Sequence, residues 1–170
     1  MPEMISTLPE QLFVVLQKEK FLILNTLDAD SGYPSVHAIS WVYAKDPGTL
    51  RFAVDARSRI VSNLQKNPHV SLSFIGAGSV HAINGSARVV TDSLEDVPFK
   101  LACVDVDIES VHDAMFYGAR IVTEPEYEKT YDKRAADKLD GQVFDAMKKP
   151  RHALCSQAFC YLIMICHIIG

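Results

Sequence analysis

Two arginines flank a serine at one point of the sequence, Arg57-Ser58-Arg59, where a short helix is expected to begin. The first turn of a helix presents free backbone N–H groups and the positive end of the helix dipole, so it favours a bound anion. Guanidinium groups and a hydroxyl add further donors suited to a phosphate. Solvated arginines at a helix start are the alternative, although they oppose the dipole when no anion is present. The cluster therefore indicates a candidate anion seat.

The residues on either side of this cluster predict how it is positioned. Leu50–Val54 is rich in strand formers, and Asn67-Pro68 ends the short helix before a further strand over 70–75. The cluster is therefore expected on a tight turn between a strand and a helix, where side chains from both elements can reach one ligand.

A strand predicted over 35–44 is the second candidate for a binding surface. Because side chains alternate along a strand, one face carries Val36, Ala38, Ser40 and Val42, and the other carries His37, Ile39, Trp41 and Tyr43. Small side chains on one face would let a flat ring lie close to the backbone. Ordinary barrel packing also alternates small and large residues, so the pattern alone leaves both interpretations open.

The overall composition limits the kinds of ligand. The 170 residues are 48% hydrophobic and 22% charged, with a formal net charge of -4, which is the balance of a soluble globular protein. A mildly acidic chain gives no support to nucleic-acid binding. The basic turn is thus a local feature that suits a small anion better than a polyanion.

The cysteines and histidines predict neither a disulfide framework nor a metal site. The four cysteines include no C-x-x-C pair, and no two of the six histidines have metal-ligand spacing on a clear helix. The N-terminus lacks a basic region followed by an apolar run, so no signal peptide is predicted. The expected compartment is the reducing cytoplasm.

The remaining elements predict an antiparallel barrel followed by a more helical region. A capping box at Thr7–Glu10 predicts a helix over 8–19. Strands are expected over 21–27, 35–44, 50–54, 70–75 and 80–91, an antiparallel meander that can curl into a barrel. Beyond it, a helix with an acidic face is expected over 98–117, a strand over 119–124 and a helix over 132–149.

Residues 1–150 are predicted to form one domain, and the tail over 151–170 differs from the rest. Residues 153–169 are almost wholly apolar but slightly short of a membrane span, which needs about 20 residues. A segment packed on the domain or a dimer interface, a tail without function and a membrane anchor all stay open, with the anchor the least favoured.

Seven short motifs follow one another in an order that is specific when they are taken together. They are Leu22–Leu27, Gly32–Ser40, Leu50–Val54, Arg57–Arg59, Asn63–Pro68, Val70–Leu72 and Ile83–Ala87. In this order the chain, over about 8–149, resembles the pyridoxamine 5'-phosphate oxidase-like, FMN-binding split-barrel family, and within it the bacterial general stress protein branch.

The resemblance implies a mainly β protein, a six-stranded antiparallel split β-barrel with flanking helices. It further implies a homodimer that binds FMN at the dimer interface. The second strand would lie along the flavin ring, and the third strand with the turn after it would hold the phosphate. The cofactor-binding residues implied in this way are Val36, His37, Ala38, Ala53, Val54, Arg57, Ser58 and Arg59.

Three departures from the family pattern concern the phosphate and the ring. Ser58-Arg59-Ile60 stands where the oxidases proper carry Ser-Arg-Lys, Ala53-Val54 where they carry Tyr-Thr, and His37 where they carry an arginine. The implied function is a cytoplasmic FMN-dependent oxidoreductase with no assigned substrate or catalytic residue. The alternatives are a stress-associated binding module without flavin turnover, or a protein that binds a deazaflavin or haem.

Overall fold

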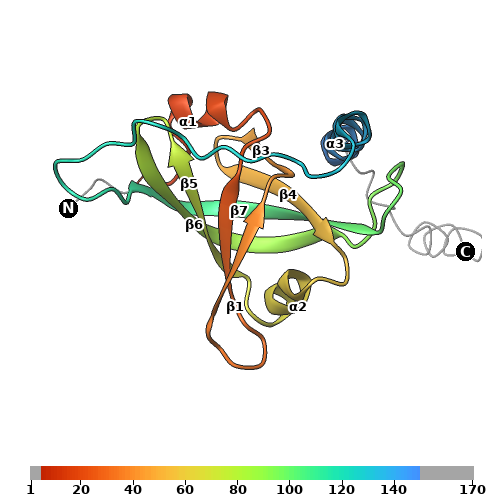
Figure 1. The fold of residues 1–170 in the computed structure, drawn as a ribbon. Coiled ribbons are helices and arrows are strands. Elements are labelled where there is room, and N and C mark those ends of the chain that lie inside the picture. Colours follow the sequence, from red (N-terminus) through yellow and green to blue (C-terminus); the bar gives the residue numbers. More distant parts are fainter. Residues whose placement is uncertain (1–4, 150–170) are drawn as a thin grey trace, which may run out of the picture.

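The computed structural model describes residues 5–149, whose seven strands form one antiparallel sheet in the order β2-β1-β5-β6-β7-β4-β3 (Figure 1). The strands are β1 (Leu22–Leu27), β2 (Pro34–Ile39), β3 (Val42–Asp46), β4 (Thr49–Asp55), β5 (His69–Gly76), β6 (Ser79–Thr91) and β7 (Leu101–Asp113). Within this part of the chain β2 pairs only with β1 and β3 only with β4, so the curled sheet does not close. The mainly β split barrel is confirmed.

Three helices within the described residues flank the barrel: α1 (Glu10–Val15), α2 (Arg59–Lys66) and α3 (Lys133–Lys148). Figure 1 shows α1 at one end of the sheet, α2 near the β1 end and α3 beside the β3–β4 side. The Asp132 carboxylate caps α3 by accepting a hydrogen bond from the backbone N–H of Ala135 at 2.8 Å. The predicted helix over 132–149 is therefore confirmed to within a residue at each end.

The barrel interior is filled by alternate side chains of the strands. Along β5, Val70, Leu72 and Phe74 are buried while Ser71 and Ser73 between them are half-buried, which is the period of two that one buried face requires. Burying each such apolar side chain stabilises the fold by about 1.5–3 kcal/mol. The main core is therefore fixed by the alternation that is visible in the sequence.

A second, smaller core lies between the outer face of the sheet and α3. It joins Ala53 on β4 and Cys103 on β7 to Val143 and Met147 on α3. This packing buries both faces of the sheet locally, so Leu101 to Val106 is a continuous buried run and not an alternating one. The outer core places α3 behind the strands that carry the candidate site.

The strand predicted over 35–44 is in fact two strands, which is why the sheet has seven strands and not six. The backbone turns sharply after β2, where the N–H of Val42 donates to the carbonyl of Ser40 at 2.9 Å. The carbonyl of Trp41 then accepts from the N–H of Ala53 on β4 at 2.9 Å. One stretch of chain thus passes from β1 to β4 and supplies both edges of the split.

The helix predicted over 98–117 is wrong, because this segment holds the strand β7. Asp105, Asp107 and Glu109 are two residues apart, and this spacing places them on one side of a strand, not along a helical stripe. The strand predicted over 119–124 is also wrong. That segment makes a backbone bond from Ile121 to Gly78 at 2.9 Å but forms no strand.

The first helix is shorter than predicted, and the capping box does not form. Pro9 precedes the helix without a side-chain cap, while the N–H of Leu8 donates to the carbonyl of Pro47 at 2.8 Å. After Val15 the backbone turns to β3, where the carbonyl of Leu16 accepts from Ala44 at 2.9 Å. The helix therefore ends where the chain begins to pair with the sheet.

The apolar tail over 151–170 lies outside the described residues, so a packed segment, a tail without function and a membrane anchor all stay open. Within residues 5–149, every helix is too short or too polar to cross a bilayer.

Candidate functional site

A cavity of about 540 Å³ lies where the sheet is split, between β2, the turn that leads to β3 and the end of β4. Its lining residues come from the edge strand β2 and the turn after it, from β4 and from the start of α2: Val36, His37, Ala38, Ile39, Ser40, Trp41, Ala53, Val54, Asp55, Ser58 and Ile60. Six of the eight residues that the sequence implied for the cofactor therefore meet in one cavity. The other two, Arg57 and Arg59, do not line it.

Strand β2 contributes a polar side chain and two small or apolar ones. His37 lies on the face that also carries Ser35 and the buried Ile39, and its Nε2 atom is 2.8 Å from the Ser35 hydroxyl. Val36 and Ala38 lie on the opposite, exposed face. The two faces predicted for residues 36–39 are thus correct. The faces predicted for residues 40–43 do not continue those of β2, because this strand ends at Ile39.

Trp41 forms the corner of the cavity at the turn between β2 and β3. Its indole Nε1–H donates to the Asp140 carboxylate of α3 at 2.9 Å. Asp140 is itself buried and also accepts from Lys129. The strand pattern places Trp41 on one face with His37 and Ile39 but assigns it no role, and the signal for one was that it is the single tryptophan of the chain.

Ser58 is the residue of the cavity with an unmet hydrogen-bonding group. It precedes the first residue of α2, yet its side chain makes no capping bond. Its Oγ atom is buried and has no hydrogen-bond partner among residues 5–149. A buried hydroxyl without a partner costs free energy that a bound acceptor recovers. Ser58 therefore marks the end of the cavity that suits a polar ligand group.

Arg59 binds carboxylates of the β1–β2 turn instead of facing the cavity. Its Nε donates to Asp28 at 2.8 Å, and its Nη2 donates to Asp30 at 2.5 Å. The Arg59 guanidinium holds the pKa of the Asp28 carboxyl far below its usual range, because the hydrogen bonds favour the charged form. In this structure Arg59 fastens α2 to the turn.

Arg57 also has a carboxylate beside it. Its Nε and Nη2 atoms each lie 3.4 Å from an oxygen of Asp55, whose pKa is lowered mainly by that contact. Asp55 lines the cavity and brings a negative charge to it. The local positive charge expected from the sequence is therefore largely neutralised by carboxylates. The sequence alone could not show this neutralisation, because Asp28 and Asp30 lie 31 and 29 residues from Arg59.

Two further α2 side chains hold the same turn. Asn63 is fully buried, accepts from the N–H of Ala29 at 2.9 Å and donates to the Thr26 hydroxyl at 2.8 Å. Lys66 donates to the carbonyl of Ala29. Helix α2 is thus fixed at both ends to the β1–β2 hairpin, and this fixes the position of Ser58 relative to β2.

Several solved structures share this fold. A candidate pyridoxamine 5'-phosphate oxidase from Lactobacillus delbrueckii is 24% identical with a TM-score of 0.54, and the match covers 63% of this chain and 94% of that one. General Stress Protein 26 from Bacillus anthracis is 14% identical with a TM-score of 0.51, over 61% and 91%. An F420 reductase is 21% identical with a TM-score of 0.51, over 61% and 98%. At these identities the likeness shows the fold alone.

The comparison by sequence family is more specific. No curated protein matches the chain. The family model described as pyridoxamine 5'-phosphate oxidase matches residues 8–110, a range that includes β1 to β6, α2, most of β7 and every residue of the cavity. Because that match spans more than half of the chain and the split sheet agrees with it, the chain belongs to the pyridoxamine 5'-phosphate oxidase family.

Proposed function

We propose that the protein is an FMN-binding oxidoreductase of the general stress type, which works as a homodimer in the cytoplasm. The observation that carries the proposal is the cavity in the split of the sheet, where strand β2 and the unpartnered hydroxyl of Ser58 line the same space. Its volume is within the range of small-molecule sites. The substrate and the electron donor are left unassigned.

The residues of the cavity suit the two ends of FMN. Ala38 and Ala53 have small side chains, which leaves room for a planar ring against β2 and β4. At the other end, a phosphate oxygen supplies the acceptor that the Ser58 hydroxyl lacks, next to the positive end of α2. Ile60 lines the cavity where the family has a lysine, and neither Arg57 nor Arg59 lines it, so phosphate binding rests on few contacts.

Bound FMN supplies hydride or electron transfer, while the protein provides binding and orientation. His37, held by Ser35, offers a ring nitrogen beside the second strand. Trp41, held by Asp140, gives the cavity one rigid aromatic wall. None of these residues is assigned as an acid or a base.

The chain carries its own probe for the test, because Trp41 is the single tryptophan and lines the cavity. Titration with FMN is expected to quench Trp41 emission with saturation at one FMN per chain. Ser58→Ala is expected to weaken binding about tenfold, since a hydrogen bond to a charged group contributes about 1.5 kcal/mol or more. Ser62→Ala, an exposed position on α2, is the matched control.

Two results would count against FMN at this cavity. One is a titration without saturable quenching, and the other is equal affinity for FMN in the Ser58→Ala and Ser62→Ala variants. An FMN-loaded protein that no reductant turns over would instead favour the binding module without flavin chemistry.

A second candidate is another cofactor in the same cavity. Because the Arg59 guanidinium is bound to Asp28 and Asp30, the cavity favours a ligand that needs fewer phosphate contacts than FMN. A deazaflavin or haem would meet that condition, and an F420 reductase shares the fold. The visible spectrum of the purified protein separates the three, because flavin, deazaflavin and haem absorb at different wavelengths.

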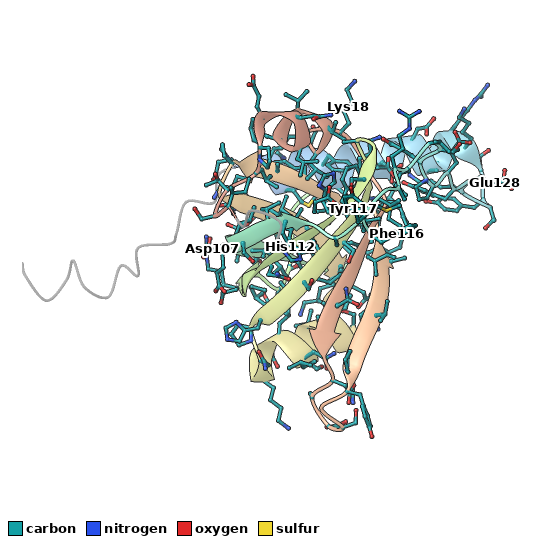
Figure 2. All side chains as sticks on the ribbon, turned by 90° about the vertical axis from the view of Figure 1, so that its left-hand side faces the viewer. Lys18, Asp107, His112, Phe116, Tyr117 and Glu128 are labelled. Carbon is teal, nitrogen blue, oxygen red and sulfur yellow. The ribbon has the colours of Figure 1, made fainter. Side chains whose placement is uncertain are left out.

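A homodimer is part of the proposal because the cavity is open on the side of β2. Val36 at its edge is 63% exposed, and Tyr33 just before the strand is 75% exposed. Figure 2 shows a further exposed pair, Phe116 and Tyr117, on the segment after β7. A second copy would cover apolar surface of this kind. Light scattering at micromolar concentration is expected to give twice the chain mass, and a monomer that still binds FMN would contradict this arrangement.

A further inference from the structure

A second cavity, of about 310 Å³, lies on the outer side of the sheet under the C-terminal end of α3. Figure 1 shows α3 beside β3 and β4, which form this side of the barrel. The cavity is lined by side chains of β3, β4, β6, β7 and α3 and shares no residue with the cavity in the split of the sheet. The two are therefore separate sites on one chain.

Three cations converge on one buried carboxylate in this outer cavity. Asp105 is fully buried, and Arg51 binds it through Nε at 2.5 Å and Nη2 at 2.9 Å. Arg88 Nη2 lies 3.0 Å from the same carboxylate and Lys45 Nζ 3.5 Å from it. One carboxylate cannot neutralise three cations, so the cluster carries more positive charge than the Arg51–Asp105 ion pair requires.

A count of the neighbouring charges gives the size of this surplus. Arg88 also meets Asp107 at 3.4 Å, whereas Lys148 has no carboxylate partner among residues 5–149 and lies 5.9 Å from the Tyr43 ring centroid. Lys149 is left out because Asp96 pairs with it at 2.5 Å. The four other cations of the lining (Lys45, Arg51, Arg88 and Lys148) contact only two carboxylates, Asp105 and Asp107, so two positive charges remain among these groups. Asp145 and Glu95 lie near Lys149 but do not line the cavity.

The structural role of the cluster accounts for only one of these cations. The Arg51 guanidinium is almost fully used, because its Nη1 also donates to the carbonyl of Met147 at 2.8 Å and so holds the end of α3. The side chains of Lys45 and Arg88 are 41% and 55% exposed. Each keeps N–H donors that have no acceptor among residues 5–149. Those donors, with the ammonium of Lys148, are available to a ligand.

We propose that this outer cavity binds a small phosphorylated organic molecule. A phosphate monoester carries a charge of about -1.5 to -2 at pH 7, which matches the surplus of two positive charges. Arginine binds phosphate oxygens with a planar pair of N–H groups, and lysine adds a point charge. The organic part contacts the apolar lining of Tyr43, Leu94 and Met147, and the volume limits it to a small molecule.

Calorimetry on the full chain, already saturated with FMN, tests this site with phenyl phosphate, inorganic phosphate and benzoate. Phenyl phosphate is expected to bind at one per chain and more tightly than either of the other two, since it alone combines the dianion with an apolar group. Lys148→Ala and Arg88→Ala are each expected to weaken its binding about tenfold, because each removes a charge-assisted contact. Both side chains are exposed, so the fold is retained.

Two control variants separate this site from the cavity in the split of the sheet. Lys138→Ala removes the same charge from an exposed position elsewhere on α3, and Ser58→Ala alters the other cavity. Neither is expected to change phenyl phosphate binding. The proposal is overturned if phenyl phosphate does not saturate, if Lys138→Ala weakens it as much as Lys148→Ala, or if Ser58→Ala abolishes it. If the protein does not bind FMN, the same titrations on the chain without FMN give these outcomes independently.

Discussion

Asp105 and Arg51 form the most deeply buried ion pair within residues 5–149, with side chains 1% and 10% exposed. Burial by itself raises the pKa of Asp105, but the hydrogen bonds and charge of Arg51 outweigh it and hold that pKa below its ordinary value. A lowered pKa means that the pair stabilises the fold above the unfolded pKa of about 3.9. That stability is lost as the pH falls below this value.

We expect Asp105→Asn to lower the free energy of unfolding at pH 7 by about 3 kcal/mol, because it leaves the Arg51 guanidinium buried without a counter-charge. Urea unfolding between pH 7 and pH 3 measures the effect, and the difference between the two proteins should shrink toward pH 3. Asp107→Asn, an exposed carboxylate on the same strand, is the control and should change stability little. An equal loss in both variants would show that the buried pair is not the cause.

The carboxylates around Arg59 lead to a second expectation at this scale. If Arg59 takes part in holding the FMN phosphate, Asp28 and Asp30 compete with the ligand for its guanidinium. Asp30→Asn removes the more exposed competitor and leaves the turn bonds of Asp28 in place. We expect it to tighten FMN binding about two- to fivefold, in line with an exposed ion pair of 0.2–1 kcal/mol.

Trp41 quenching by FMN measures this change, and Asp137→Asn on the exposed side of α3 controls for net charge. Unchanged or weaker FMN binding in Asp30→Asn, relative to Asp137→Asn, would remove Arg59 from the phosphate contacts.

Among the elements, two glycines allow a matched comparison of sheet and helix. A Cβ atom on Gly85 would lie 2.3 Å from the backbone oxygen of Asp107, at the irregular register between β6 and β7. A Cβ on Gly141, inside α3, meets nothing within 4 Å. The close approach of two strands thus needs glycine at one position, while the helix does not need it at the other.

We therefore expect opposite effects from the same substitution. Gly85→Ala should destabilise the protein by about 1–3 kcal/mol, because backbone atoms must move apart. Gly141→Ala should stabilise it by about 0.5–1 kcal/mol, since alanine loses less entropy in a helix. Thermal or urea unfolding of both variants provides the measurement. A stabilising Gly85→Ala would mean that β6 and β7 are farther apart in solution.

The same elements show what the sequence could and could not predict. The extent of β1, the turn before α2 and the extent of α3 follow from local composition, turn and periodic signals, and the predictions for all three agree closely with the structure. Strand β7 was predicted as a helix because its acidic residues were assigned to one helical face, although Val104, Val106 and Ile108 alternate with acidic residues at the period of two that marks a strand. That six of the candidate residues share one site was inferred only through the family resemblance, although local patterns had singled out Ser58 and the strand with Val36. The binding of Arg59 to Asp28 depends on a contact between residues far apart in sequence.

At the scale of the whole molecule, one chain of contacts links the cavity wall to segments far apart in sequence. Trp41 donates a hydrogen bond to Asp140 on α3. The Lys129 ammonium binds both Asp140 and Glu19, and its Nζ atom lies 3.0 Å from the Glu19 carboxylate. The hydroxyl of Tyr127 donates to the same Glu19 carboxylate at 2.6 Å. Helix α3 and the segment before it therefore hold Trp41 in place although they lie outside the barrel.

We expect Asp140→Ala to shift Trp41 emission to longer wavelength, because the indole loses its acceptor and becomes more exposed to water. FMN binding should weaken several-fold, as expected when a rigid wall of a cavity is loosened. Emission spectra and FMN titrations test both effects, with Asp137→Ala on the exposed face of α3 as the matched control. An Asp140→Ala protein with unchanged emission and affinity would show that α3 has no influence on the cavity.

The strand order has a consequence for the way the protein is made. β7 is the strand that joins β6 to β4, and it is the last of the seven strands that residues 5–149 contribute to the sheet. While the ribosome is still adding residues before Leu101, the group β2-β1-β5-β6 and the hairpin β3–β4 are two separate sheets with unpaired edges, which are open to pairing with other chains. The arrival of β7 converts them into one sheet, so substitutions in β7 should reduce the yield of folded protein during synthesis more than equally destabilising ones in β2.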